Sequence, residues 1–431
     1  MLNKFDELIS QAQMAFTNAQ YDYCIELCQA ALQLEPGSIA VYTLKGNSYL
    51  VMNHFKEAER EFRKAIELDD KTGERYFDLG NSLFGQQRLS EALGSYAAAT
   101  QFGCREEILK KIYYIMGVIN QVSQNNYKDA LLNYEKSDKL PGDNADQADI
   151  LLKKIQIYVG QRDFFKAENC AIQLKYLLPS EFQSYQLLFQ VYLEQKKTHE
   201  AKKILDEAEK NVDITQEIKI EIGFDRAMLS CFLAEQSPEE KNKYYEQALK
   251  QLAALGKSGM LDQKDRCEVL IISAEIYLKL EKYDMAVKLA SAVAAYTEDA
   301  LLEYIERGRY ILLECGERQK NYFTVRKYAK LLKDSENLFY KHHGYYSEAY
   351  AVKKLTEINQ SFQRECSELY NIAIAYYRNC TVTSPGDFLA YLYRAKSYVD
   401  IGKYEKAEEI GKLLPDDVRK SLNDYISRVR K

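Results

Sequence analysis

Small and aromatic residues recur through the N-terminal half of the chain, where residues 39–72 match residues 73–106 at a period of 34 positions. The first repeat has Tyr42, Gly46, Tyr49, Phe55, Ala58, Phe62 and Ala65, and the second has Tyr76, Gly80, Leu83, Leu89, Ala92, Tyr96 and Ala99. Residues three and four apart share one face of a helix, so each repeat predicts two amphipathic helices. Small residues such as Gly46 and Ala58 let the two backbones approach closely, and the aromatic residues fill the space beside them.

The same register continues on both sides of these two repeats. It recurs as Cys24, Cys28, Ala31 and Pro36, as Tyr114, Tyr127, Ala130 and Tyr134, as Leu151, Tyr158, Phe164, Ala167 and Pro179, and as Tyr185, Tyr192, Ala201 and Ala208. A proline shortly after the last turn of a helix prevents the helix from continuing. We therefore expect six regular helix pairs over residues 5–213.

Beyond residue 213 the period loosens, and divergent helix pairs are expected over residues 214–380. Apolar spacing predicts helices near 214–234, 238–255, 263–280, 283–296 and 299–315. The pattern Tyr304, Gly308 and Ile311 predicts a further unit whose second helix, near 322–332, is displaced by an insertion, and residues 339–380 predict a longer pair. Residues 387–430 are expected to form a last unit and a capping helix, with Asp387 as an N-cap.

The order of small, aromatic, alanine and proline residues, together with the period of 34, resembles the tetratricopeptide repeat family. The family's usual tryptophan is replaced by Tyr42, Tyr76, Tyr114, Tyr185 and Tyr391, in a chain with 0 Trp and 35 Tyr. The resemblance implies an all-α, right-handed superhelical solenoid of about 11 antiparallel helix pairs with a C-terminal capping helix. It also implies a concave groove, lined by the first helix of each pair, that binds another polypeptide.

Amide side chains recur at one position of most first helices, directly after a small residue in the first three units. They are Gln13, Asn47, Asn81, Gln156 and Gln190, interrupted in the fourth unit by Ile119. Amides can bond the backbone of a peptide whatever its sequence, and apolar neighbours can take its side chains. We therefore expect a peptide-binding site at Gln13, Asn47, Phe77, Asn81, Phe84, Gln156, Gln186 and Gln190. The alternative is that these amides only help to pack successive first helices.

One binding mode of the family is excluded by charge. Its carboxylate clamp uses Lys, Asn and Arg on three successive first helices to hold the acidic C-terminal tail of a chaperone. Here the corresponding positions have Ile9, Leu44, Glu74 and Asp78. Two acids would repel a carboxylate, so no chaperone tail is expected to bind through a clamp.

Composition limits the partners and the compartment. The net charge is −5, with 59 basic and 64 acidic residues interspersed, so no nucleic-acid partner is expected. The longest uncharged apolar run is too short for a bilayer, which requires about 20 residues, so no membrane insertion is expected. The 9 scattered cysteines and the acidic N-terminal residues without a signal peptide favour the cytoplasm.

No catalytic constellation is recognisable, so we expect neither an enzyme nor a cofactor or metal site. The chain has 4 histidines. His54 and His199 are expected in solvated turns, and the adjacent His342 and His343 point to different faces of a helix. The best-supported function is a protein–protein interaction scaffold or adaptor that binds a polypeptide in the groove. The alternative is a peptide- or ligand-sensing regulator that acts through a separate effector protein.

Overall fold

The computed structural model describes residues 4–69, 71–123 and 126–430. Within these residues all regular structure is helical, with 23 α-helices, two short 3-10 helices and no strand. The chain forms two compact units, Met1–Asp213 and Ile214–Lys431. The predicted all-α class is confirmed.

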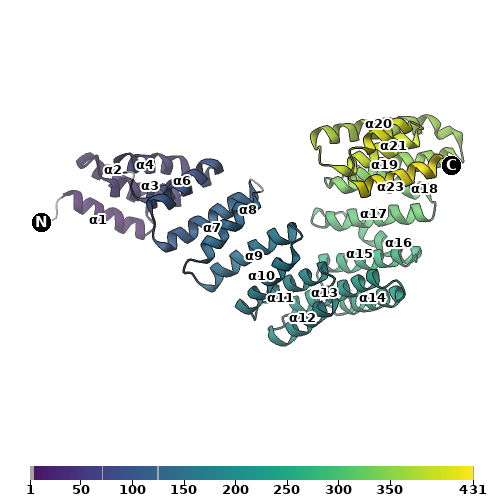
Figure 1. Ribbon diagram of the computed structural model, residues 1–431, viewed down its shortest axis with the longest axis horizontal. Helices are drawn as coiled ribbons and strands as arrows, with labels where there is room; N and C mark the ends of the chain where they lie inside the picture. The colour runs from purple at the N-terminus through teal and green to yellow at the C-terminus, as the bar shows by residue number, and fades with distance from the viewer. Residues whose placement is uncertain (1–3, 70, 124–125, 431) are drawn as a thin grey trace. The chain divides into compact units, whose positions relative to one another are not determined.

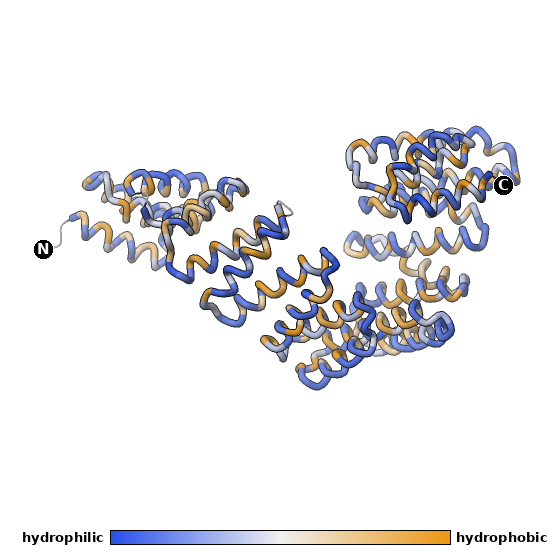
Figure 2. Tube along the Cα trace, viewed as in Figure 1, coloured by the Kyte–Doolittle hydropathy of each residue, from blue (hydrophilic) through white to orange (hydrophobic). Residues whose placement is uncertain are grey.

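The first unit is a stack of antiparallel helix pairs, each helix packing on the next (Figure 1). Its helices are α1 (Lys4–Thr17), α2 (Tyr21–Leu34), α3 (Ile39–Val51), α4 (Phe55–Leu68), α5 (Gly73–Gly85), α6 (Leu89–Phe102), α7 (Glu106–Val122), α8 (Tyr127–Asp138), α9 (Asn144–Gly160), α10 (Phe164–Leu177), α11 (Phe182–Glu194) and α12 (Thr198–Asn211). Apolar and polar residues alternate along every helix, so each helix turns an apolar stripe to its neighbours (Figure 2).

The second unit continues the same pattern of pairs and ends with a single helix (Figure 1). Its helices are α13 (Gln216–Gln236), α14 (Lys241–Lys257), α15 (Gln263–Lys279), α16 (Tyr283–Ala294), α17 (Leu302–Arg318), α18 (Tyr322–Leu332), α19 (Leu338–Thr356), α20 (Gln363–Thr383), α21 (Phe388–Asp400), α22 (Tyr404–Gly411) and α23 (Asp416–Arg430). Short 3-10 helices, η1 (Asp299–Leu301) and η2 (Gln360–Phe362), precede α17 and α20. Helices α1 to α22 of the described chain therefore fit the expected number of pairs.

Eight of the turns inside the pairs share one backbone conformation. Their left-handed residues are Ala19, Asn53, Gln87, Arg162, Lys196, Glu281, Lys320 and Gly402. In the second pair, the His54 amide donates to the Tyr49 carbonyl at 2.9 Å and the Asn53 amide donates to Leu50 at 3.0 Å. These are the two bonds of a Schellman motif, which satisfies the carbonyls at the end of a helix. The left-handed residue therefore marks the register of each pair.

Glycine on the first helix sets how closely three of the pairs pack. A Cβ built on Gly80 would lie 2.6 Å from the Tyr96 ring, and one on Gly117 would lie 2.6 Å from the Tyr134 ring. Gly117 therefore takes the small-residue position of the fourth pair. The residue that follows it is Val118, so the predicted interruption of the amide column at Ile119 was placed one residue too late.

The expected insertion near residue 320 is wrong. Helix α17 ends at Arg318 and α18 begins at Tyr322, with the left-handed Lys320 in a turn as short as the others. A Cβ on Gly308 would meet the Ala290 carbonyl at 3.0 Å, in the preceding pair, so Gly308 does not face α18. The sequence pattern gave the wrong result here because a glycine on a helix can allow close packing against either the preceding or the following helix.

A buried carboxylate and three tyrosines join the last helices of the second unit. Asp400, at the end of α21, accepts hydrogen bonds from the hydroxyls of Tyr346 at 3.0 Å, Tyr370 at 3.1 Å and Tyr425 at 2.7 Å. Lys353 pairs with the same carboxylate at 2.9 Å. These residues come from α19, α20 and α23, so polar contacts as well as apolar packing hold the C-terminal cap.

Candidate peptide-binding face

The first helices of successive pairs contact one another in the first unit, α1 with α3, α3 with α5 and α5 with α7. Their common side forms one surface, which we call the first-helix face. Five of the eight predicted site residues lie on α1, α3 and α5, and Gln156, Gln186 and Gln190 lie on α9 and α11. The first helices line two depressions, of which the first brings two predicted residues together and the second contains none of them.

The first depression has a volume of about 590 Å³ and spans α1, α3 and α5. Gln13 and Asn47, two of the predicted amides, line it together. The middle of its lining comes from α3 and is mainly apolar, with Ile39 and Leu44. The depression thus offers amide groups beside an apolar wall, which suits an extended peptide.

Two acids from α5 complete the lining of the first depression. Glu74 pairs with Arg105 at 2.8 Å, and Arg75, also in the lining, pairs with Asp69 at 2.8 Å. Within the described residues, no hydrogen bond or ion pair is made by the Asp78 side chain. Burial, and then repulsion from Glu74, raise the pKa of Asp78 to about 7.

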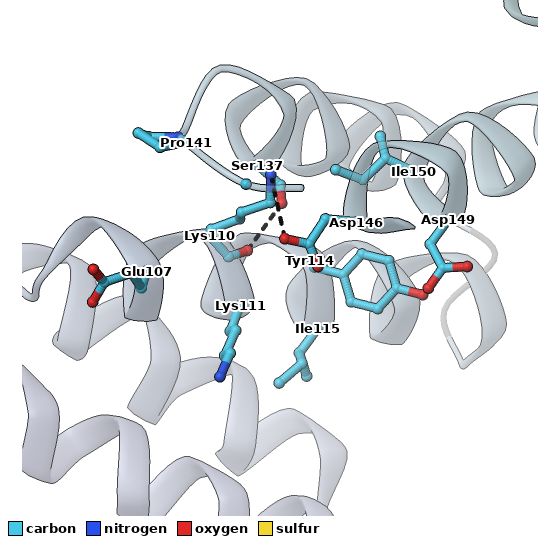
Figure 3. Close-up of a pocket in the computed structure, with 11 residues that line it drawn as sticks. Glu107, Lys110, Lys111, Tyr114, Ile115, Ser137, Pro141, Asp146, Asp149 and Ile150 are labelled. Carbon is cyan, nitrogen blue, oxygen red and sulfur yellow. Dashed lines mark hydrogen bonds and ion pairs between the residues drawn. The ribbon is translucent and has the colours of Figure 1, made fainter. Parts of the chain in front are cut away.

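The second depression lies between α7, α9 and the loop before α9, with a volume of about 310 Å³ (Figure 3). Lys110 forms part of it and is only 8% exposed. Its ammonium group donates to the Leu140 carbonyl at 3.2 Å and lies 3.8 Å from Asp146. A Cβ on Gly142 would lie 2.1 Å from that ammonium group, so a larger residue there would require the Lys110 side chain to shift.

The rim of the second depression combines charge with an aromatic ring. Glu107 and Lys111 of α7 are exposed, and Tyr114 is half-buried beside them. Burial, and then the Asp149 carboxylate of α9, raise the pKa of the Tyr114 hydroxyl. The tyrosine therefore stays protonated and can donate a hydrogen bond at neutral pH.

The predicted residues differ in how accessible they are. Asn81 is half-buried, and its side-chain oxygen accepts a hydrogen bond from the Tyr96 hydroxyl at 2.9 Å. This bond joins the two helices of one pair, as expected if the amide serves packing. Phe84 is 40% exposed. The remaining residues divide into exposed Gln13, Gln156 and Gln190 and half-buried Asn47, Phe77 and Gln186.

The sequence prediction did not include any site in the second unit, although its first helices also line depressions. One, of about 380 Å³, has Phe224 and Met228 from α13 and Ile272 from α15. At its edge Arg307 of α17 bonds the carboxylate of Glu268 at 3.1 Å. The loose period after residue 213 is the reason these residues could not be aligned with the amide column.

The adjacent histidines singled out in the sequence line neither depression. His342 bonds the Tyr376 hydroxyl at 2.9 Å and the Asp387 carboxylate at 2.8 Å, whereas His343 bonds Tyr393 at 2.9 Å. Asp387 also accepts the amide of Ala390 as an N-cap. In the described part of the chain, no group of three or more His, Cys, Asp or Glu side chains is arranged to hold a metal ion.

No helix among residues 4–69, 71–123 and 126–430 combines the length and the apolar character needed to cross a bilayer. All nine cysteines are free thiols. Burial, followed by the charge of Cys24, raises the pKa of the Cys28 thiol to about 12. Such a thiol stays protonated and is a poor nucleophile.

Residues 43–103, which include the Gly46 and Gly80 pairs, match the family model described as a tetratricopeptide repeat. Over these residues the chain is similar to tetratricopeptide repeat proteins. Among curated proteins, it is 26% identical over 110 residues to small glutamine-rich tetratricopeptide repeat-containing protein 2 of Mycosarcoma maydis. It is 24% identical over 214 residues to anaphase-promoting complex subunit 3 of Schizosaccharomyces pombe.

These two matches cover 26% and 46% of this chain, and 31% of each relative. The chain thus matches about a third of the length of these relatives. Solved structures with similar helix stacks include yeast Tom70, with 13% identity, a TM-score of 0.46 and coverage of 98% of this chain and 95% of that chain. Another is YrrB, a tetratricopeptide repeat protein with an unusual peptide-binding site, with 18% identity, a TM-score of 0.36 and coverage of 42% and 90%.

Proposed function

We propose that this protein is an adaptor whose first-helix face binds an extended segment of another polypeptide. Tetratricopeptide repeat proteins generally mediate protein–protein interactions. The observation that supports this role most directly is the first depression, where Gln13 and Asn47 from different pairs lie beside the apolar side chains of α3. The proposal places the partner in the cytoplasm and assigns the chain no catalytic step.

In this proposal the amides bind the peptide backbone and the apolar wall binds the peptide side chains. Amide groups donate and accept hydrogen bonds to peptide N–H and C=O groups, which are the same in every sequence. The apolar wall and Phe84, which is 40% exposed, accept side chains of the partner. Such a face favours an extended segment, whose side chains alternate between two sides.

A display experiment tests the proposal without knowledge of the natural partner. The full chain is used to select peptides from a random displayed library, and the selected pool is measured against Gln13→Ala and Asn47→Ala variants. We expect the double variant to lose most binding of the pool. Asn81 is left unchanged because its bond to Tyr96 would confuse a loss of binding with a loss of packing.

Matched controls are available on the second helix of the first pair. Gln29 and Gln33 of α2 are also exposed amides, but they lie outside the first-helix face. The double variant Gln29→Ala and Gln33→Ala should therefore bind the pool as the native chain does. If both double variants bind the pool equally well, or if no peptide is enriched, binding at this face is ruled out.

A further inference from the structure

The first depression holds a negative charge that no other described residue balances. Arg75, the one cation in the described lining, forms an ion pair with Asp69. Glu74, one of the two acids in the lining, forms an ion pair with Arg105. Asp78 is left as a half-buried carboxylate with no ion pair in the described residues. Burial of an unpaired carboxylate is unfavourable, so a structural role in the free protein does not account for it.

The neighbouring side chains cannot supply the missing counter-charge. The residues of α3 that line the depression, including Thr43, Leu44 and Asn47, have no charge. Lys45 of the same helix is 7% exposed and pairs with Glu61 at 3.4 Å, away from the depression. A basic group that pairs with ionised Asp78 would therefore have to come from a bound molecule.

We propose that the first depression receives a lysine or arginine side chain of the bound polypeptide, with Asp78 as its counter-charge. The inference rests on the proposed function and specifies the chemistry of the partner. The peptide backbone lies against Gln13 and Asn47, and apolar residues beside the basic one pack on Ile39 and Leu44. The charge preference is opposite to that of a clamp for acidic tails.

Two other cations fit the observations less well. A divalent metal ion prefers several oxygen ligands, but Glu74 is already bonded to Arg105, which leaves Asp78 as one available carboxylate. A free polyamine has no peptide groups to bond the amides and no apolar side chains to pack on the apolar wall. The combined lining of amide, apolar and acidic groups therefore favours a basic residue within a peptide.

The electrostatics of Asp78 add a pH dependence to this recognition. The raised pKa, about 7, means that part of the Asp78 population is protonated at neutral pH in the free protein. The charged groups around it are Glu74 on its own helix, Arg75 held by Asp69, and the Cys104 thiol, whose pKa is raised to about 11 first by burial. A bound cation stabilises the ionised carboxylate. The affinity for a basic peptide should therefore be independent of pH well above pH 7, where Asp78 is already ionised, and should weaken below about pH 6, where Asp78 is protonated.

The test uses fluorescein-labelled peptides of alternating leucine and serine that differ only at the central residue. Binding to the full chain is measured by fluorescence anisotropy with lysine, arginine, glutamine or glutamate at that position. We expect the lysine and arginine peptides to bind about tenfold more tightly than the glutamine peptide, and the glutamate peptide to bind most weakly. Spermidine at the same concentration should not displace the lysine peptide.

The variant Asp78→Asn should remove the preference for lysine over glutamine. Asp22→Asn, at an exposed acid on α2, is the matched control and should keep the preference. Thermal unfolding of each variant shows whether it is folded. Equal binding of the lysine and glutamine peptides by the native chain, or a preference that survives in Asp78→Asn, overturns the assignment of Asp78 but leaves peptide binding intact. Binding of no peptide by the native chain overturns the proposed function as well.

Discussion

The side-chain amide of Gln86 donates a hydrogen bond to the carboxylate of Glu59 at 2.7 Å, which ties the end of α5 to α4 of the preceding pair. Arg88 pairs with the same carboxylate at 2.7 Å. The amide also donates to the Phe55 carbonyl at the start of α4, at 3.3 Å. One glutamine therefore joins two successive pairs of the first unit.

The same connection recurs in the last pair of that unit. Gln195 donates to Glu168 at 2.8 Å and to the Phe164 carbonyl at 3.1 Å, and Lys197 pairs with Glu168 at 2.7 Å. The sequence separations equal those of the Gln86 contacts. Stability of a repeat array depends on contacts between neighbours, so these bonds should contribute to the cohesion of the unit.

Replacement of Gln86 by alanine should lower the free energy of unfolding by about 1 to 2 kcal/mol, because a hydrogen bond to a charged group and a second bond to a carbonyl are lost. Urea denaturation of the full chain measures the change. Gln101→Ala, at an exposed amide of α6, is the control and should change stability by less than about 0.5 kcal/mol. Similar effects at both positions would show that the contact between pairs is not stabilising.

Acid should weaken the same contact through Glu59. Burial raises the pKa of this carboxyl, but hydrogen bonds from Gln86, Arg63 and Arg88 outweigh burial and hold it below its ordinary value of 4.5. Stability from an acid with a lowered pKa is present above the unfolded value and is lost as the pH falls through the folded value. The Glu59→Gln variant should therefore be less stable than the native chain at pH 7 but nearly equal to it at about pH 3.

The measurement for Glu59 is the urea midpoint of both proteins over that pH range. Glu67→Gln, at an exposed acid on the same helix, provides the comparison for general effects of acid. A difference between native and Glu59→Gln proteins that does not change with pH would contradict the electrostatic explanation.

Packing of glycine against an aromatic ring gives a third prediction. A methyl group on Gly80 would lie 2.6 Å from the Tyr96 ring, so Gly80→Ala should force the two helices apart and destabilise by about 1 to 3 kcal/mol. Gly94, on the partner helix α6, has no atom within 4 Å of the corresponding position. Gly94→Ala should instead stabilise by about 0.5 to 1 kcal/mol, because alanine favours the helix. Urea denaturation distinguishes them, and a stabilising Gly80→Ala would contradict the packing assignment.

The sequence predicted the helices of the first unit well because its period is strict. Gly80 and Tyr96 define both helices of a pair, and the structure places them in contact. The hydrogen bonding of the amides could not be predicted, because the period places Asn47 and Asn81 at the same position. Only the partner differs: position 96 is a tyrosine, whose hydroxyl reaches Asn81, and the equivalent Phe62 has no hydroxyl to donate.

The buried contacts of Asp400 were beyond prediction for a different reason. The hydroxyl of Tyr346 donates to a residue 54 positions away, so no local pattern reports the contact. Tyrosine-rich stretches were interpreted as replacements for tryptophan in packing. The structure shows that the hydroxyl groups of Tyr346, Tyr370 and Tyr425 also matter, since they satisfy a buried carboxylate.

Loss of the Asp400 charge should destabilise the second unit strongly. Its side chain is 1% exposed. Asp400→Asn removes the charge that pairs with Lys353 and replaces one of the two oxygens that accept from the three tyrosines with an amide donor. Removing one member of a buried ion pair costs about 3 to 5 kcal/mol. Tyr425→Phe, which removes a single donor, should cost about 1 to 2 kcal/mol. Hydrogen exchange should show the loss in α19 to α23, and equal effects of the two variants would contradict a central role for the carboxylate.

Asp78 should have the opposite effect on the pH dependence of stability to Glu59, because the folded protein disfavours the ionised form of Asp78. Its pKa is raised from 3.8 to about 7, so the folded protein loses stability as the pH rises from the unfolded value through the folded one. Asp78→Asn should therefore be more stable than the native chain at pH 8, by about 1 to 2 kcal/mol, since partial contact with water reduces the effect of the full shift. Near pH 4 the two proteins should be equally stable. Urea midpoints at the two pH values measure this, with Asp22→Asn as the reference. A variant less stable than the native chain at pH 8 would mean that Asp78 serves the fold, and would remove the reason to assign it to a bound cation.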